Sequence, residues 1–338
     1  MMNNTLKNPA CKASSGTVIT GKWHKQSYRI LKPLGYGANG YVYLASGTAG
    51  LVAIKLSDNN MSITSEVNVL RHFSKVQEST LGPSLLDVDD WFRPELGVTI
   101  PFYVMEYVKG EEFLTFVNGR GNEWIGILSS QLLQDLDKLH SAGWVFGDLK
   151  PDNLLVTGPP PKVRWLDVGG VTVQGRSIKE FTEFFDRGYW GVGSRVAEPS
   201  YDLFAVAMII INASLQKRFN KSSSGGEKQL RDIITSTSSL QKFEHVLMYA
   251  IEGKYKNALD MRKDLISAMS NARSVPTKSK PKAYSQQPAK HQKPTASMTR
   301  KGQKIVKKKK GKKGVFETIL IFVFLLGAYF LYVYGQLI

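Results

Sequence analysis

The stretch from residue 148 to residue 169 is the feature that most constrains the fold of this 338-residue chain. It contains Asp148, Lys150 and Asn153 close together, and Asp167 follows, directly ahead of a valine and a glycine. A phosphoryl-transfer site needs a carboxylate that orients the acceptor, a cation near the phosphate and oxygen ligands for a divalent metal. Each of these residues alone is more often a surface polar group. Together, in this order, they predict such a site on two neighbouring loops.

A glycine-rich segment lies much earlier in the chain. Gly35, Gly37 and Gly40 form the pattern G-x-G-x-x-G, which alone is a weak signal because ordinary hairpins also contain it. A dinucleotide site would need a helix directly afterwards, whereas residues 41–44 read Tyr-Val-Tyr-Leu and predict a strand. Glycines in a hairpin let backbone N–H groups approach phosphates closely. Lys55 falls on the third predicted strand, where its charge can hold the same phosphates.

The apolar pattern changes along the chain from strands to helices. Runs typical of strands come first, at 28–34, 41–45, 51–56 and 102–108. Leucines then recur at three- and four-residue spacing from Leu128 to Leu139, and 201–215 is apolar nearly all round, as in a helix at the centre of a lobe. We therefore expect an α+β fold with a β-rich small lobe followed by a helical large lobe.

With these motifs in order, the region from about Tyr28 to Leu265 resembles the protein kinase superfamily, in particular the bacterial eukaryotic-like (Hanks-type) serine/threonine protein kinases, in a short form with a C-terminal transmembrane anchor. The resemblance implies a bilobed kinase fold that holds ATP and Mg²⁺ (or Mn²⁺) in the cleft and phosphorylates protein substrates. Lys150, two residues after the aspartate, resembles serine/threonine kinases more than tyrosine kinases.

The resemblance also assigns roles to individual residues. Asp148 would be the catalytic carboxylate with Lys150 beside it, and Asn153 and Asp167 would bind the metal. Asp202 would steady the catalytic loop from below. Lys55 would pair with Glu66. Residues 102–108 would form the hinge, with Met105 as its gatekeeper, and Glu111 or Glu112 would lie near the ribose. The residues expected to contact ATP are Leu34, Gly35, Gly37, Gly40, Val42, Ala53, Lys55, Glu66, Met105, Glu106 and Val108.

The sequence departs from the family pattern at several positions. Phe146 and Gly147 replace the usual His-Arg before the aspartate, so a phosphorylated activation segment would lack its arginine partner. Val168 replaces a phenylalanine and is a smaller apolar plug. The short link between Lys55 and Glu66 predicts a trimmed first helix. The candidates for autophosphorylation in the activation segment are Thr172, Ser177 and Thr182.

The usual Ala-Pro-Glu after the activation segment is also missing. Residues 197–199 read Ala-Glu-Pro and are the expected substitute, with Arg262 as the partner of Glu198.

The positive charge of the chain is concentrated in one segment. Of the formal net charge of +17, fifteen Lys/Arg lie in 273–313, which contains no Asp or Glu, and +2 is left on the rest. This Lys-, Pro- and Ser-rich linker cannot bury enough apolar surface to fold alone. We expect 304–313 to lie on an anionic membrane surface and 273–300 to bind DNA non-specifically, which would couple DNA to kinase activity. The residues proposed for DNA or an anionic surface are Lys278, Lys280, Lys282, Lys290, Lys293, Arg300, Lys301, Lys304, Lys307, Lys308, Lys309, Lys310, Lys312 and Lys313.

The C-terminal region has the composition of a membrane span. Residues 315–334 contain one acid, Glu317, and at about 1.5 Å per residue they span roughly 30 Å, the thickness of a bilayer core. The basic side precedes the span, so the positive-inside rule keeps the kinase domain in the cytoplasm at the cell membrane. The expected division is 1–21 as a flexible extension, 22–272 as the kinase domain, 273–313 as the linker, 315–334 as the span and 335–338 as a short tail.

Two other interpretations stay open from the sequence. A kinase of a small molecule on the same fold is favoured by Gly147-Asp148, which antibiotic and sugar kinases often carry, and opposed by Lys150-Pro151. A catalytically weak pseudokinase scaffold is favoured by Phe146, Gly147 and Val168, and opposed by the retention of the phosphate- and metal-contacting residues. Phosphotransfer assays separate these interpretations.

Overall fold

The computed structural model describes residues 9–37, 40–75, 82–223 and 225–273. The chain divides into one unit that ends at Thr277 and a second from Lys278 onward. Residue 273, predicted as the start of the linker, ends α9, and the rest of the predicted linker (274–313) and the predicted span 315–334 lie outside the described residues. Within the described ranges, no helix is long and apolar enough to cross a bilayer.

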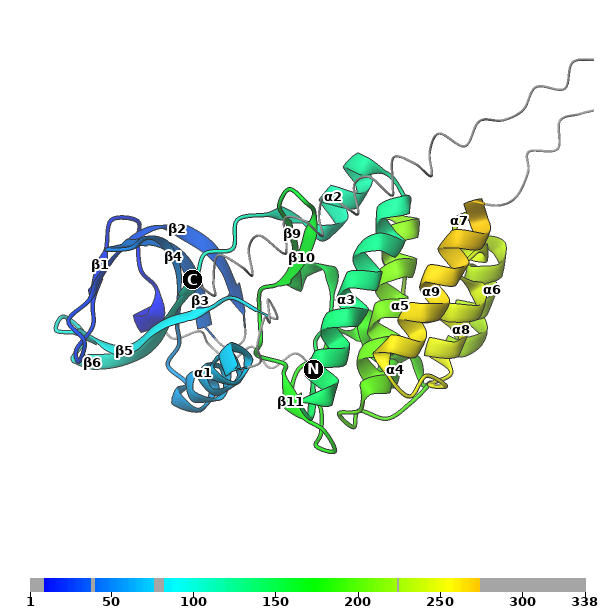
Figure 1. Ribbon diagram of the computed structural model, residues 1–338. Coiled ribbons are helices and arrows are strands. Elements are labelled where there is room, and N and C mark those ends of the chain that lie inside the picture. The colour runs from blue at the N-terminus through cyan, green and yellow to red at the C-terminus, as the bar shows by residue number, and fades with distance from the viewer. Residues whose placement is uncertain (1–8, 38–39, 76–81, 224, 274–338) are drawn as a thin grey trace, which may run out of the picture. The chain divides into compact units, whose positions relative to one another are not determined.

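The small lobe is an antiparallel sheet of strands in the order β1-β2-β3-β4-β6-β5, with one helix beside it (Figure 1). Its elements are β1 (Val18–Thr20), β2 (Ser27–Gly37), β3 (Gly40–Gly47), β4 (Gly50–Leu56), α1 (Asn60–Lys75), β5 (Leu85–Arg93) and β6 (Val98–Glu106). The predicted strands at 28–34, 41–45, 51–56 and 102–108 all fall within this sheet, except that β6 ends at Glu106. The glycine segment is therefore a hairpin between two strands, as its apolar flanks predict.

The sheet closes on itself through the N-terminal segment. Gly21 forms a bridge to Trp91 of β5, and the N–H of Lys22 donates to the carbonyl of Asp90 at 2.8 Å. Ile19 and Cys11 are buried in the small-lobe core. The expectation of a flexible extension over 1–21 is thus wrong for 9–21, because these apolar side chains and the edge pairing of β1 bring the segment into the fold.

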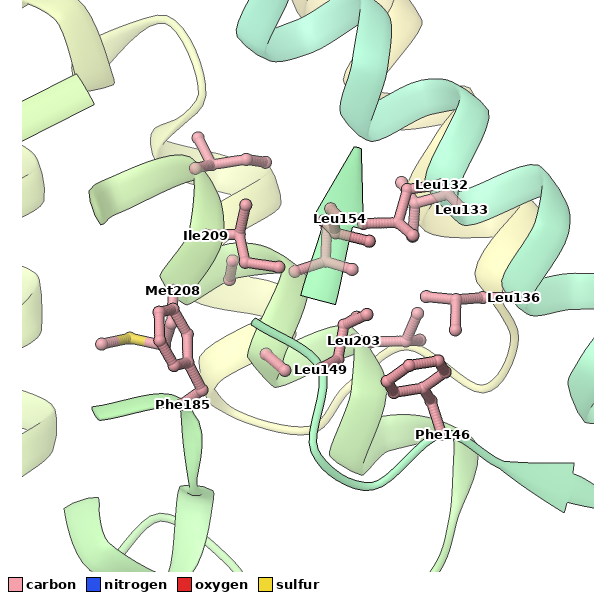
Figure 2. Packing of buried hydrophobic residues seen from close by; sticks show 14 of the residues in the cluster. Leu132, Leu133, Leu136, Phe146, Leu149, Leu154, Phe185, Leu203, Met208 and Ile209 are labelled. Carbon is pink, nitrogen blue, oxygen red and sulfur yellow. The ribbon is translucent and has the colours of Figure 1, made fainter. Parts of the chain in front are cut away.

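The large lobe is helical and forms around the helix predicted at 201–215. Its helices are α2 (Phe113–Arg120), α3 (Glu123–Ser141), α4 (Arg187–Trp190), α5 (Pro199–Leu215), α6 (Gly226–Ser236), α7 (Ser238–Gln241), α8 (Glu244–Ile251) and α9 (Ala258–Arg273). Pro at the first turn starts α5 without the loss of a helical hydrogen bond. Figure 2 shows Leu132, Leu133 and Leu136 of α3 gathered with side chains of α5 and of the loop around Leu149. The leucine spacing therefore marks the buried face of α3.

Short strands place the functional loops between the lobes. The 3-stranded sheet β10-β9-β7 and the pair β11-β8 consist of β7 (Glu111–Glu112), β8 (Trp144–Val145), β9 (Leu154–Thr157), β10 (Lys162–Trp165) and β11 (Thr172–Val173). The short helices η2 (Pro151–Asn153) and η3 (Glu183–Phe185) lie in the loops that carry the predicted site. The 148–153 run comes shortly after β8, and Asp167 comes shortly after β10.

Candidate active site

A buried ion pair joins β4 to α1. Lys55 Nζ lies 2.6 Å from Glu66 Oε2, which also accepts from the hydroxyl of Tyr103 at 2.7 Å. Ser62 donates to the other carboxylate oxygen at 3.0 Å. Burial opposes the charge of Lys55, but the carboxylates of Asp167 and Glu66 outweigh it and raise the pKa of Lys55. The structure therefore forms the predicted Lys–Glu pair and keeps the ammonium charged.

The helix that supplies Glu66 is not trimmed, contrary to the expectation from the short link. α1 has 16 residues, and only three residues, 57–59, separate it from β4. Asn59 caps the helix, since its side-chain oxygen accepts from the N–H groups of Met61 and Ser62 at 3.1 Å. The small number of residues between Lys55 and Glu66 thus reflects a short connection between β4 and α1, and not a shortened helix.

Asp202 holds the catalytic loop from α5. Its carboxylate is fully buried and accepts from the backbone N–H groups of Phe146 at 2.7 Å and Gly147 at 3.0 Å. His140 Nε2 lies 2.9 Å from the same carboxylate, a contact that the helical pattern around it did not single out. These bonds are the geometry of the supporting role that the resemblance predicts for Asp202.

Backbone conformation and close packing both favour a glycine at position 147. Its φ is +84°, a left-handed conformation that favours glycine. A Cβ there would lie 2.6 Å from the carbonyl oxygen of Gly170. An arginine at this position, as in the family pattern, would not fit without movement of the loop that follows Asp167.

The acceptor side of the site is built from Asp148, Lys150 and Thr182. Thr182 Oγ1 lies 3.0 Å from Asp148 Oδ1 and accepts from Lys150 Nζ at 3.0 Å. Lys150 Nζ also contacts Asp148 Oδ2. Thr182 was expected only as a phosphorylation candidate, because its long-range partners are not visible in the sequence.

The predicted metal ligands lie near the buried ion pair. Asp167 Oδ1 is 3.7 Å from Lys55 Nζ and accepts from the N–H of Gly169 at 2.9 Å. The side-chain nitrogen of Asn153 donates to the Asp148 carbonyl at 2.9 Å, so its oxygen is the atom left to face a cation. A carboxylate and an amide oxygen are suitable ligands for a hard divalent metal.

A cavity of about 410 Å³ lies between these groups and the hinge. Of the predicted residues, those that line it are Leu34, Gly35, Val42, Ala53, Lys55, Met105, Glu106, Val108, Glu112, Asn153 and Asp167. Its volume and its apolar walls with a polar end suit a nucleotide. Gly37, Gly40 and Glu66 are outside the lining that the structure describes. Gly40 has a φ of +126°, and a side chain there would overlap the carbonyl of Leu56, so its contribution is to the shape of the hairpin.

The two unusual apolar residues, Phe146 and Val168, are both buried in the main core cluster. Phe146 is 1% exposed and its ring centroid lies 5.0 Å from that of Trp165, which in turn lies 6.2 Å from Phe73 of α1. Val168 is buried in the same cluster. Phe146, Trp165 and Val168 thus belong to one buried cluster between the lobes' apolar side chains.

The activation segment is anchored by a network other than the one expected. Glu198 pairs with Arg187 Nη2 at 3.1 Å, whereas Arg262 Nε donates to the carbonyl of Ser130. The expected pairing of Glu198 with Arg262 is therefore wrong, because a nearer arginine in the same loop occupies the carboxylate. Thr172 is buried and donates to the Gly170 carbonyl, which leaves Ser177 as the exposed candidate for phosphorylation.

Asp186 is the centre of this network. Its fully buried carboxylate accepts from Arg195 Nε at 2.8 Å and Nη2 at 2.6 Å, and from the hydroxyl of Tyr201 at 2.9 Å. It also caps α4 through the N–H groups of Gly188 and Tyr189. No local motif in the sequence marks this aspartate.

Comparison with known proteins places this site in a class. The sequence profile described as "Protein kinase domain" matches residues 28–284, and the chain belongs to the protein kinase family. Over 336 residues it is 50% identical to the serine/threonine-protein kinase YabT of Bacillus subtilis (strain 168), with 98% of each chain covered. The chain is a serine/threonine protein kinase, and its family uses ATP with a divalent metal.

More distant relatives agree on the class. The chain is 36% identical over 142 residues to the serine/threonine-protein kinase AGC1-5 of Arabidopsis thaliana, which covers 38% of this chain and 23% of that protein. The solved structure of vaccinia related kinase 3 is similar with a TM-score of 0.55 at 15% identity, over 78% of this chain and 93% of that one. At this identity the second likeness concerns the fold alone.

Proposed function

We propose that this kinase is anchored in the cell membrane by residues 315–334 and transfers the γ-phosphoryl group of ATP, with Mg²⁺, to Ser/Thr hydroxyls of cytosolic proteins and of itself. The observation that carries the catalytic part is that Lys55, Asn153 and Asp167 line one cavity, with Asp148 joined to Asn153 by the hydrogen bond to the Asp148 carbonyl. Bound ATP supplies the transferred group, and the metal supplies positive charge at the phosphate oxygens.

The chain's own residues define where the acceptor would lie. The hydroxyl of Thr182 already lies 3.0 Å from Asp148 Oδ1, which shows that this oxygen can engage a hydroxyl. We propose that Asp148 orients the acceptor hydroxyl and takes its proton, while Lys150 balances the charge on the phosphoryl side. Glu66 holds Lys55 at the phosphate end, and Asn153 and Asp167 would hold the metal.

Transfer of labelled phosphate by the full-length protein tests the catalytic part. We expect transfer to itself and to a basic protein or casein, and loss of transfer in Lys55→Ala and Asp148→Asn. Asp148→Asn should still bind ATP, because Asp148 does not line the cavity that the structure describes. ATP binding without transfer by the wild type would favour the pseudokinase scaffold, and transfer to small alcohols alone would favour a small-molecule kinase.

The membrane part of the proposal rests on the apolar run 315–334 and the basic residues before it. In membranes from cells that express the chain, we expect it to resist extraction at alkaline pH and to expose its kinase domain to protease on the cytoplasmic side only. A chain that is released by alkali would contradict the anchor.

The basic linker is the proposed site of control by DNA. Fifteen positive charges without an acid favour binding to DNA phosphates without sequence readout. We expect affinity for DNA to fall as salt rises and to be lost when the fourteen predicted Lys/Arg are replaced by Gln. Addition of DNA should change the rate of autophosphorylation in the wild type only. Equal binding by anionic vesicles, with no effect of DNA on the rate, would assign the linker to lipid.

A further inference from the structure

Arg164 links three segments that meet at the hinge. Its Nη1 donates to Glu106 Oε1 at 3.2 Å and its Nη2 to Glu106 Oε2 at 2.9 Å, and Nη2 also donates to the carbonyl of Gly82 at 3.0 Å. Arg164 belongs to β10 of the large lobe, whereas Glu106 ends β6 and Gly82 precedes β5 in the small lobe. A bidentate guanidinium–carboxylate pair fixes orientation as well as distance. We call Arg164, Glu106, Gly82 and Ser84 the hinge clamp.

Glu106 is held on its other side too. Its carboxylate accepts from the N–H of Ser84 at 3.2 Å and from the Ser84 hydroxyl at 3.4 Å, and its own N–H donates to the Ser84 carbonyl at 2.8 Å. Burial alone would raise the pKa of Glu106, but the bonds from Arg164 and Ser84 outweigh it and lower that pKa. The pair is therefore ionised at neutral pH, with side-chain exposures of 15% for Arg164 and 36% for Glu106.

The orientation of Arg164 follows the hinge and not its own surroundings. Its Nε–H is buried and has no hydrogen-bond partner among the described residues. If the guanidinium were oriented only to satisfy its own donors, it would turn until Nε–H met an acceptor, because a buried unpaired donor is costly. The bonds to Glu106 and Gly82 thus determine how the side chain lies.

The clamp connects the two ends of the nucleotide cavity. Glu106 and Val108 line the cavity at the hinge, and Asp167 lines it at the proposed metal end. Arg164 lies three residues before Asp167, and the intervening Trp165 is 1% exposed, which makes this stretch of chain stiff. We propose that Arg164 is a positioning residue that fixes the hinge backbone relative to Asp167, so that one nucleotide can engage both ends. This inference rests on the proposed use of the cavity for ATP.

Replacement of Arg164 in the full-length protein tests the clamp. We expect Arg164→Met to raise the KM for ATP and the Kd for Mg²⁺–ADP, measured by calorimetry, about tenfold, or about 1.4 kcal/mol. The kcat and the KM for a protein acceptor should stay within about twofold. Arg164→Lys should recover only part of the affinity, because an ammonium cannot form two parallel bonds to one carboxylate.

Two further variants separate the clamp from a general loss of stability. Glu106→Gln should weaken nucleotide binding to a similar degree, and the double variant Arg164→Met/Glu106→Gln should be no weaker than either single variant. Arg231→Met is the matched control, since Arg231 also forms two hydrogen bonds to carboxylate oxygens but lies on α6. It should leave nucleotide affinity unchanged.

The outcomes distinguish this inference from the proposed function. A wild-type protein that binds no nucleotide would refute the proposed function itself. Normal binding and transfer by the wild type, with unchanged nucleotide affinity in Arg164→Met, would refute the clamp alone. A rise in kcat at unchanged KM for ATP would also refute it, because the pair would then restrain the hinge and not position it.

Discussion

The anchor at Asp186 predicts a large loss of stability on the change Asp186→Ala. The carboxylate caps α4, and loss of such a cap costs about 1 kcal/mol. The hydroxyl of Tyr201, on a side chain that is 1% exposed, would lose its acceptor at about 1–3 kcal/mol. The pair with Arg195 adds at most about 1 kcal/mol, because the arginine side chain is 45% exposed. The expected total is about 2–5 kcal/mol.

Urea unfolding of the full-length protein, followed by tryptophan fluorescence, measures this loss. The kcat should fall as well, because Thr182, which contacts Asp148, is in the loop that Asp186 anchors. Glu227→Ala is the control: Glu227 also pairs with an arginine but is 53% exposed, so its loss should cost less than about 0.5 kcal/mol. A loss below about 1 kcal/mol for Asp186→Ala would refute the anchor.

Three smaller predictions concern other positions. Gly147→Ala should lower both stability, by about 1–3 kcal/mol, and kcat, since its Cβ would lie against the Gly170 carbonyl; wild-type values in urea unfolding and transfer assays would contradict this. The hydrogen bond to Asp87 raises the pKa of His24, so protonation stabilises the folded chain. The difference in unfolding midpoint between wild type and His24→Gln should thus be largest below pH about 6.5 and vanish as the pH rises through the pKa of His24 in the folded chain. A difference that stays constant with pH would be inconsistent with this prediction. Burial raises the pKa of Cys11 to about 11, so its thiol should react with a disulfide reagent at pH about 8 only after unfolding, and fast reaction of the folded protein would show otherwise.

The parts of the structure that could be predicted are those with local signals. The strands around Gly35–Gly40 and the buried face of α3 follow from apolar periodicity, which is determined by the residues themselves. The positions of Asp148 and Asp167 follow from motif order. In each case the residues that decide the feature lie near one another in the chain.

The parts that could not be predicted depend on contacts between distant segments. β1 has only three residues, and the bridge to Trp91 that follows it is made by a single residue, Gly21, so neither has a periodic signature. His140 reaches Asp202 from another helix, and Arg187 meets Glu198 only once the loop has folded. Single polar residues of this kind resemble ordinary surface residues until their partners are known.

The central claim is that Lys55, Asp148, Asn153 and Asp167 serve one nucleotide–metal complex. Calorimetric titration of ATP into the wild type and Asp167→Asn, with and without Mg²⁺, tests it most directly. The account predicts that Mg²⁺ strengthens ATP binding to the wild type and has little effect on the variant, because a ligand of the metal is lost. Equal enhancement by Mg²⁺ in both proteins would contradict the account.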